Sequence, residues 1–593
     1  MKHRLTTLFA VCGLLGLFIS FPAVHDASAA SRKPVVGKKG MAVAVEPLAT
    51  QVAADILKKG GNAVDAAVGL GLALAVTHPS AGNIGGGGFM IIRLADGTAV
   101  AIDYREKAPG KAHARMYLDE DGNRAVNPAI SFTRSDGSTF HPNTNRIHHL
   151  AIGVPGTPAG FALALEKYGT MSMAEVIQPA IELAENGFIL TDRIARGLNG
   201  RKAIFSQIPA SKKAMMRADG KDWQEGDRWI QKDLAETLKR IARDGHDGFY
   251  KGKTAELIEK DMKAGGGMID RTDLANYQAI IREPVRNVYR GIYETISMPP
   301  PSSGGITMAM MLNILEGYDL GRMGHNSSST LHVMAEAMRL AYADRARYLG
   351  DADFVEIPGH LTSKDYAAAQ RSKVDPFFAT PSEEVGPELT LATEPDETTH
   401  YSVVDQWGNA VSNTYTLEGG YGSHIVIAGT GMLTNNEMGD FNPDPGITRP
   451  TGQIGTPPNL IEPNKRMLSS MSPTIVTRNG ELYLVVGSPG GRTIINTTMQ
   501  LILNVIDHGM NMQEAVNAPR IHHQWFPDRL RIEGGVGREV LDALKAMGHD
   551  ISSRGFGGGS YRQGDGHSIM VDPDTGYRLG APDPRIEGAA FGH

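Results

Sequence analysis

The first residues with evident chemistry are Thr398 and Thr399, which open the segment T-T-H-Y-S-V-V in a chain of 593 residues. The alternation of this segment is typical of a strand, and the polar, aperiodic residues 374–396 before it are typical of an exposed linker where a chain can be cut. A cut in front of Thr398 would give that residue a free α-amine, so nucleophile and general base would come together. Threonine pairs also occur in strands for packing alone, and the surrounding residues decide between the two interpretations.

A hairpin places further polar groups beside Thr398. The segments T-T-H-Y-S-V-V and A-V-S-N-T-Y-T flank D-Q-W-G-N, and a turn centred on Trp407 sets Thr398 opposite Thr416. By the two-residue period of a strand, Glu418 shares their face. The pattern predicts a hydroxyl and a carboxylate beside the candidate nucleophile, in a register that a bulge in the loop would shift.

A second hairpin has a stronger turn signal. T-I-V-T-R and E-L-Y-L-V-V-G flank an Asn-Gly pair at residues 479–480, which favours a two-residue type I′ turn. That turn predicts that Ser470 lies opposite Pro489 and that Ser469 lies opposite Gly490. The segment L-S-S-M-S-P is then expected next to S-P-G-G.

Gly490 and Gly491 come directly before a helix that we predict over residues 492–506. Backbone N–H groups at a helix start have no partner inside the helix and lie at the positive end of its dipole. Facing a reacting carbonyl, such groups form an oxyanion hole. A plain strand-to-helix turn would use the same glycines, so both interpretations stay open at this point.

Between the hairpins, N-N-E-M-G-D-F carries Glu437 and Asp440, three residues apart, which can converge on one cation. Hard oxygen ligands are too few there for a dedicated calcium site, so a substrate ammonium group is the better match. We expect neither a metal nor a cofactor, and a solvated acidic turn is the alternative. The Pro- and Gly-rich residues 442–463 that follow have the length of a lid over a pocket.

The composition is that of an ordinary globular protein, with 41% hydrophobic residues, 21% charged residues and a net charge of −6 at pH 7. Because no long basic run is present, we expect no nucleic-acid partner. Helical spacing predicts helices over residues 47–59 and 62–76, and a strand over 89–93 follows four glycines. Residues 160–350 follow mainly helical patterns, whereas residues 120–148 are typical of a polar surface excursion.

The first 30 residues are typical of a secretory signal peptide. Lys2, His3 and Arg4 form a charged start, an apolar run follows over residues 8–21, and A-S-A-A closes the segment. The run is shorter than a membrane span needs. It contains the only cysteine, Cys12, so the nucleophile of the exported chain must be another residue type. We expect export to the periplasm or the medium, with no membrane association after the signal is removed.

Taken together, these segments resemble the γ-glutamyltransferase (γ-glutamyltranspeptidase, glutathione hydrolase) family over nearly all of the chain after the signal. The resemblance rests on motifs in the family's order: N-I-G-G-G-G-F, D-Y-R-E-K-A-P, P-G-T-P-A-G, P-P-P-S-S-G-G, T-T-H-Y-S-V-V-D, N-N-E-M-G-D-F, L-S-S-M-S-P-T and S-P-G-G. It implies an α+β fold, the four-layer αββα sandwich of the N-terminal-nucleophile hydrolases, and a precursor that cuts itself. The implied cut lies between Glu397 and Thr398 and gives a large subunit over 31–397 and a small subunit over 398–593, which stay associated.

The family also implies catalytic roles. Thr398 Oγ would attack the γ-carbonyl with its own α-amine as base, and Thr416 would hold the nucleophile in place. Gly490 and Gly491 would donate N–H groups to the oxyanion. Substrate binding would divide between a clamp on the α-carboxylate and a group of acids on the α-ammonium. The clamp corresponds to Arg105, Ser469 and Ser470, and the acids correspond to Glu418, Glu437 and Asp440.

Three positions depart from the family pattern. Glu418 stands where some members have Asn and Glu437 stands where some have Gln, and both changes add negative charge for selecting a free α-amine. Thr451 occupies the region where bacterial members often carry a lid tyrosine. The balance between hydrolysis and transfer depends on this closure.

We expect a secreted γ-glutamyl hydrolase and transferase that acts on glutathione and related compounds, with water, amino acids or dipeptides as acceptors. A cephalosporin (glutaryl) acylase on the same fold is the enzymatic alternative, but its substrate lacks the α-amine, and three unpaired acids in its pocket would be costly. A transpeptidase for poly-γ-glutamate would want a more open pocket than a lid-length loop allows. A binding protein without activity would show a broken nucleophile, clamp or glycine turn, and none is broken here.

Overall fold

The structure, a computed structural model, describes residues 33–133, 136–386, 398–442, 456–554 and 560–593. Residues Lys33–His593 form one compact unit. The predicted signal peptide, Glu397 and Thr451 lie outside the described residues. Within the described ranges, no helix combines the length and the apolar character that crossing a membrane requires.

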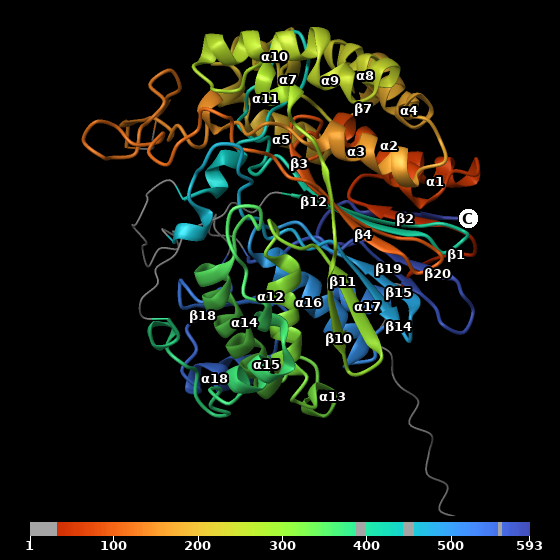
Figure 1. The fold of residues 1–593 in the computed structure, drawn as a ribbon, viewed down its shortest axis with the longest axis vertical. Coiled ribbons are helices and arrows are strands. Elements are labelled where there is room, and N and C mark those ends of the chain that lie inside the picture. The colour runs from red at the N-terminus through yellow and green to blue at the C-terminus, as the bar shows by residue number, and fades with distance from the viewer. Residues whose placement is uncertain (1–32, 134–135, 387–397, 443–455, 555–559) are drawn as a thin grey trace, which may run out of the picture. The chain divides into compact units, whose positions relative to one another are not determined.

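Two seven-stranded antiparallel sheets form the centre of this unit (Figure 1). The first sheet has the order β21 (Ala589–Gly592), β2 (Met41–Ala44), β12 (Thr399–Val404), β13 (Ala410–Thr416), β3 (Gly87–Arg93), β4 (Ala99–Tyr104) and β9 (Ile280–Arg282). The second sheet has the order β1 (Val35–Gly37), β20 (Arg578–Ala581), β19 (Ser568–Val571), β15 (Glu481–Val486), β14 (Thr474–Arg478), β11 (Tyr293–Ser297) and β10 (Val285–Tyr289).

The two sheets pack face to face, as the alternation of their apolar residues dictates. Phe89 and Ile91 of β3 lie in a core between the sheets, where they share a cluster with Val485 of β15. Met90 and Ile92 of β3 point the other way, into a core beneath helices. All five are fully buried, and each side chain of this size contributes roughly 1.5–3 kcal/mol to folding when removed from water. Each sheet is therefore covered on both faces.

Helices cover the outer face of each sheet (Figure 1). The first sheet is covered by α1 (Pro47–Lys58), α2 (Ala63–Thr77) and α3 (Thr157–Tyr168). On these helices, α4 (Met173–Asn186) packs against α2, and α8 (Lys232–Asp244) packs against α4. The second sheet is covered by α12 (Gly304–Leu315), α16 (Thr493–Ile506) and α17 (Met512–Asn517), and α14 (Ser328–Tyr348) packs against α12. The predicted αββα sandwich is confirmed.

Shorter elements complete the described chain. The remaining helices are α5 (Asp192–Gly200), α6 (Lys202–Phe205), α7 (Pro209–Met215), α9 (Asp247–Tyr250), α10 (Gly252–Gly265), α11 (Arg271–Ala275), α13 (Leu320–Met323), α15 (Lys364–Arg371) and α18 (Arg538–Ala546). The remaining strands are β5 (Phe132–Thr133), β6 (Thr139–Phe140), β7 (Phe188–Ile189), β8 (Arg228–Trp229), β16 (Ile521–His522), β17 (Leu530–Ile532) and β18 (Ile551–Ser552).

The two N-terminal helices form where their spacing and caps predict. α2 begins at a capping box, in which the Asn62 side chain accepts from the helix start and the Asp65 side chain accepts from the Asn62 N–H. Gly60, with φ +95°, allows the tight joint between α1 and α2. The predicted boundaries are confirmed to within two residues at each end.

One stretch of the region predicted as mainly helical forms strands instead. β10 and β11 flank a turn at Arg290 and Gly291, whose φ values of +50° and +76° fit a hairpin turn of the primed type. The alternating sequences V-R-N-V-Y and Y-E-T-I-S carry this signal. Each strand has only five residues, so its alternation is lost when hydrophobic spacing is averaged over a window long enough to detect a helix.

The two predicted hairpins differ in outcome. In the first, Thr399 pairs with Tyr415 and His400 with Thr414, so the predicted register is confirmed. In the second, the positive φ values at residues 479–480 confirm the turn, but a bulge between Val476 and Thr477 shifts the ladder by one residue. The predicted pairings of Ser470 with Pro489 and of Ser469 with Gly490 are therefore wrong. The ladder ends at Thr474 and Val486, and Ser469 forms an isolated bridge with Ser302 instead.

Candidate active site

Thr398 lies directly before β12, an interior strand of the first sheet, and is 9% exposed. Its Oγ1 donates to Thr416 Oγ1 at 3.4 Å, which extends the predicted pairing one position beyond the ladder. Thr416 Oγ1 also accepts from the Glu418 N–H at 2.8 Å. Because 3.4 Å is long for a bond between hydroxyls, this contact orients the Thr398 hydroxyl without locking it.

The turn from β15 into α16 passes through Gly490 and Gly491, with φ values of +124° and +55°. Side chains rarely adopt such values, and a Cβ at Gly490 would lie 2.5 Å from Thr493 Oγ1. The Gly490 carbonyl accepts from the N–H of Thr493 at 3.1 Å and from its Oγ1 at 2.7 Å. This carbonyl therefore caps the start of α16. The positive φ and the close contact allow only glycine at this turn.

Arg105 is the centre of a buried ion cluster. It follows β4 and is 1% exposed, and its two terminal nitrogens donate separately to Glu437 and to Asp440, the latter at 2.5 Å. The backbone carbonyls of Met467 and Leu468 accept further bonds at 3.3 and 3.4 Å. The cation and the acids that were predicted to bind opposite ends of a substrate head group thus pair with one another in the structure.

The cluster holds more carboxyl groups than its cations can balance. Burial raises the pKa of Glu437 well above its ordinary value, against the opposing effect of Arg105. Burial likewise raises the pKa of Glu106 to about 7 and that of Glu418 to about 8. For Arg105, burial lowers the pKa, but Glu437 and the other acids outweigh it and the pKa is raised. Protons are therefore retained in this site near neutral pH.

Glu418 is paired with a residue that the sequence analysis missed. Arg146 donates to Glu418 Oε1 and Asn436 donates to its Oε2, and the Glu418 side chain is only 2% exposed. Arg146 belongs to the polar excursion over residues 120–148, which therefore reaches the candidate site. The two partners are 272 positions apart, so no local pattern could reveal the contact.

Ser469 and Ser470 are held by the P-P-P-S-S-G-G loop and by α14. The N–H and the Oγ of Ser303 both donate to the Ser469 carbonyl, at 2.7 and 2.6 Å. Arg345 of α14, which is 1% exposed, donates to Ser470 Oγ at 2.9 Å and to Ser303 Oγ at 2.8 Å. Arg345, also missed from the sequence, adds a positive charge behind the two serines.

One end of the predicted lid is tied to the ion cluster. Asn459 Nδ2 donates to the Asp440 carbonyl at 2.7 Å, and Asn459 Oδ1 accepts from the Leu468 N–H at 2.9 Å. Asn442 Nδ2 donates to the Thr456 carbonyl at 2.9 Å. The described residues on either side of positions 443–455 are therefore joined at the base of the loop.

One small cavity collects nearly all of the predicted site residues. Nine of the ten line it, namely Arg105, Thr398, Thr416, Glu418, Glu437, Asp440, Ser469, Ser470 and Gly491. Gly490 is not among the lining residues, and the sequence analysis missed two that are, Met471 and Ile494. The cavity volume of ≈ 20 Å³ suits about one water molecule.

The αββα sandwich with a threonine hydroxyl at the start of an interior strand defines the class of N-terminal-nucleophile hydrolases. The model of the family Gamma-glutamyltranspeptidase matches residues 49–593. The chain belongs to this family, as the motifs predicted.

Named relatives agree with this assignment. The chain is 48% identical to the glutathione hydrolase proenzyme of Escherichia coli (strain K12), over 93% of this chain and 91% of that protein. It is 40% identical to the acylase ACY 1 proenzyme of Pseudomonas sp. (strain SE83), over 96% of each. The crystal structure of a cephalosporin acylase from Bacillus halodurans superimposes with a TM-score of 0.81 at 26% identity, covering 97% of this chain and 99% of that one.

Membership of the Gamma-glutamyltranspeptidase family identifies the type of enzyme. The chain is an enzyme, a γ-glutamyl hydrolase or transferase made as a self-cleaving precursor, and it acts on a small molecule as a two-subunit protein. The predicted type of enzyme is confirmed.

Proposed function

We propose that this enzyme cleaves the γ-glutamyl bond of glutathione and related compounds through an ester of Thr398. The acyl group then passes to water or to the amine of an amino acid or dipeptide. One observation carries the proposal: a nucleophilic hydroxyl, a guanidinium fork and three carboxyl groups line the same cavity. An α-amino acid head group needs that combination, because it presents a carboxylate and an ammonium on one carbon.

The precursor must first be cut between Glu397 and Thr398. The products are a large subunit over 31–397, after removal of a signal peptide over 1–30, and a small subunit over 398–593. The cut frees the α-amine of Thr398, which then lies on the residue whose hydroxyl it activates. β12 is paired on both edges, by β2 and β13, so the new N-terminus stays in place.

In the acylation step, Thr398 Oγ bonds to the γ-carbonyl carbon and its proton passes to the α-amine of the same residue. The carbonyl oxygen becomes an oxyanion that accepts from the N–H groups of Gly490 and Gly491. Collapse breaks the carbon–nitrogen bond, and the leaving amine takes the proton from the Thr398 ammonium. Thr416 keeps the hydroxyl facing the carbonyl. Water or an acceptor amine then reverses the sequence and frees Thr398.

Binding of the head group exchanges ion pairs. The α-carboxylate replaces Glu437 and Asp440 on the guanidinium of Arg105, with hydroxyls from Ser469 and Ser470. The α-ammonium takes the released acids together with Glu418. Each buried charge keeps an opposite partner throughout, so the exchange avoids the cost of stranding a charge in a dry pocket. A ligand without the ammonium leaves those acids unpaired.

The test compares a γ-glutamyl anilide with a glutaryl anilide, which differ only in the α-amine. We expect kcat/KM to favour the γ-glutamyl compound by about 10²-fold or more, since a site with unpaired buried polar groups rejects a ligand that cannot satisfy them. Thr398→Ala, assayed with both anilides, measures the rate of hydrolysis that does not depend on the proposed nucleophile. Equal or reversed preference would refute the proposal and make Glu418, Glu437 and Asp440 structural residues.

That second outcome would favour the alternative, a cephalosporin (glutaryl) acylase. The Pseudomonas relative is named an acylase, and the Bacillus halodurans structure is named a cephalosporin acylase. The raised pKa values of Glu418 and Glu437 give this candidate its specific support, because protonated carboxyl groups tolerate a missing ammonium better than carboxylates do. The ion pairs of Arg105 with Glu437 and Asp440 weigh against it, since they show acids that take a cation partner.

A further inference from the structure

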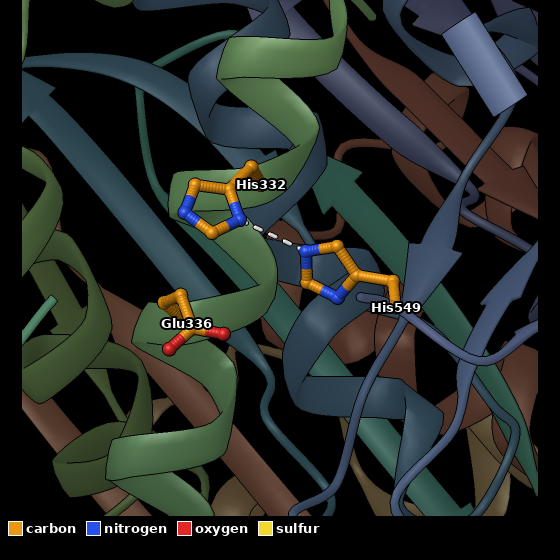
Figure 2. A group of neighbouring side chains, drawn as sticks. All are labelled: His332, Glu336 and His549. Atoms are coloured by element: carbon orange, nitrogen blue, oxygen red, sulfur yellow. Dashed lines mark hydrogen bonds between the residues drawn. The ribbon is translucent and has the colours of Figure 1, made fainter. Parts of the chain in front are cut away.

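A second cluster of functional side chains lies away from the catalytic cavity, between α14 and the segment that follows α18. His332 and Glu336 are one turn apart on α14, and His549 approaches from the segment between α18 and β18 (Figure 2). All three are buried, and one candidate ligand atom of each lies within 4.8 Å of the others. Nothing in the catalytic scheme uses this cluster.

The hydrogen bonds of His332 direct a lone pair into the cluster. Its Nε2 contacts the Asp375 carbonyl at 2.7 Å, and since a carbonyl only accepts, Nε2 carries the proton. In the neutral ring Nδ1 is then unprotonated and accepts from His549 Nε2 at 2.9 Å, so zinc can bind His549 Nε2 once the proton there moves to Nδ1 of the same ring. A ring N–H bonded to a backbone carbonyl is the usual outer support of a metal-binding histidine. The His549 Nδ1 is buried without a hydrogen-bond partner among the described residues, so hydrogen bonds alone do not complete the cluster.

Glu336 offers an oxygen to the same space. Arg339 contacts only Oε1 of Glu336, through Nη2 at 3.2 Å and Nε at 3.3 Å. Oε2 accepts a long bond of 3.4 Å from the Thr380 N–H. Arg339 also donates to Asp528 and to Ser382, so its charge keeps a partner when Glu336 turns to another cation.

We propose that His332, Glu336 and His549 form a binding site for one divalent transition-metal ion of the zinc type. Two imidazoles and a carboxylate are ligands that zinc accepts, and tetrahedral bonds of ~2.0–2.2 Å place ligand atoms about 3.3 Å apart. The two ring nitrogens, at 2.9 Å, must therefore separate by about 0.4 Å, and the carboxylate must swing inward. Three ligands from two segments leave the fourth tetrahedral position to a water molecule.

The site would join the two products of precursor cleavage. His332 and Glu336 belong to the predicted large subunit, and His549 belongs to the predicted small one. The same place is already bridged by a backbone bond from the Ala379 N–H to the Met547 carbonyl, at 2.7 Å. A metal here would tie α14 of the large subunit to the small subunit after cleavage at residue 397. The binding of zinc itself does not depend on that cleavage or on the proposed substrate.

The experiment uses tag-free, full-length exported protein, because a polyhistidine tag would bind the probe. The protein is stripped with a chelator, incubated with Zn²⁺ alone, passed through a desalting column and measured by mass spectrometry of the elements. We expect about one zinc per chain in the wild type. Glu336→Gln, which keeps the side-chain volume, and His549→Ala should each retain less than a tenth of that amount.

A matched histidine pair provides the control. His325 and His508 also come from the two predicted subunits, with ring centroids 5.1 Å apart, the same spacing as His332 and His549. That pair is only partly buried and does not form a cluster with a third ligand within the described residues. His508→Ala should therefore bind zinc as the wild type does.

Thermal unfolding separates loss of the site from loss of the fold. Zinc should raise the melting temperature of the wild type and of His508→Ala by several degrees, because it binds only the folded state. Folded Glu336→Gln should show no such rise. A wild type that retains no zinc overturns the proposal, and so does equal zinc binding by the wild type and Glu336→Gln.

Discussion

The catalytic cavity has two halves that are built differently. The proposed reacting half consists of the hydroxyls of Thr398 and Thr416 and the backbone at Gly491, which Gly490 precedes, and none of these side chains carries a charge. The recognition half is a dense set of charges around Arg105. Its partners come from separate parts of the chain, including the excursion that carries Arg146 and the segment that carries Glu437.

The difference predicts how mutations in each half should behave. In the proposed mechanism the reacting half is neutral and stabilises charge that appears only during the reaction, so damage there should lower kcat. The recognition half pairs charges that the substrate carries from the start, so damage there should raise the apparent dissociation constant of the donor. A reacting-half variant that changed only donor affinity, or a recognition-half variant that changed only kcat, would contradict this division of the cavity.

Thr398→Ala should have the largest effect, because it removes the nucleophile of both processing and catalysis. We expect a single chain of nearly full exported mass on a denaturing gel, and a loss of activity of at least about 10⁴-fold. Thr398→Ser is the control, since it keeps a hydroxyl at the same place and should still give two subunits. Two subunits from Thr398→Ala would show that another residue performs the cut.

Gly490→Ala should come next. The added methyl group would lie 2.5 Å from Thr493 Oγ1 and would impose a side chain on a φ of +124°, so the turn must move. Loss of one oxyanion donor lowers kcat by about 10²–10³-fold, and we expect an effect of that size with little change in KM.

The control for Gly490→Ala is Gly480→Ala in the second hairpin. Gly480 also has a positive φ, +86°, but a Cβ there would meet nothing within 4 Å. That variant should lower the melting temperature slightly and leave kcat unchanged. Equal kcat losses in both variants would trace the effect to general strain instead of the oxyanion turn.

Arg105→Lys tests the recognition half. Lysine keeps the charge but not the fork that contacts two carboxyl groups at once, so we expect the KM of the γ-glutamyl donor to rise by about 10–100-fold with a smaller change in kcat. Arg282→Lys is the matched control, because Arg282 also joins two acids, Asp103 and Asp353, outside the cavity. A fall in kcat alone in Arg105→Lys would contradict the division.

The reacting half was largely predictable from the sequence because its geometry is local. The pairing of Thr398 with Thr416 follows from a hairpin with a short loop, and the Gly490–Gly491 turn follows from a strand that runs into a helix. The same local reasoning failed at the bulge after Val476, where one extra residue shifted the second hairpin. A bulge is set by packing against neighbouring strands and leaves little signal in the sequence.

The residues of the recognition half were predicted only where they lie in motifs shared with the family. Arg146 and Arg345 were missed because their partners, Glu418 and Ser470, lie 272 and 125 positions away. The ion pairs of Arg105 with Glu437 and Asp440 could not be predicted from the sequence either. They arise because buried charges need opposite partners, which is a property of the assembled pocket.

The raised pKa of Glu418 predicts that recognition of the substrate depends on pH. Burial raises its pKa to about 8, so the group is mostly protonated at pH 6.5 and mostly ionised at pH 8.5. Only the ionised form attracts an ammonium group. We therefore expect the inhibition constant of L-glutamate to fall by several-fold, at most about 10-fold per pH unit, across this range. Glutarate, which lacks the amine, should show no such fall, and parallel curves would show that Glu418 does not face the ammonium.

Arg146→Ala should have the smallest effect and should move that pH curve. Arg146 lowers the pKa of Glu418, so its removal raises the pKa further and delays ionisation to higher pH. Because the Arg146 side chain is 31% exposed, solvent screens the pair, and we expect a shift of less than about one pH unit with a 2–5-fold weaker inhibition by L-glutamate at pH 7. Arg124→Ala is the control, because Arg124 lies in the same excursion but is not among the charges that shift the pKa of Glu418, and it should leave the curve in place. A kcat loss in Arg146→Ala at unchanged inhibition would place the excursion with the reacting half, and the division of the cavity would have to be redrawn there.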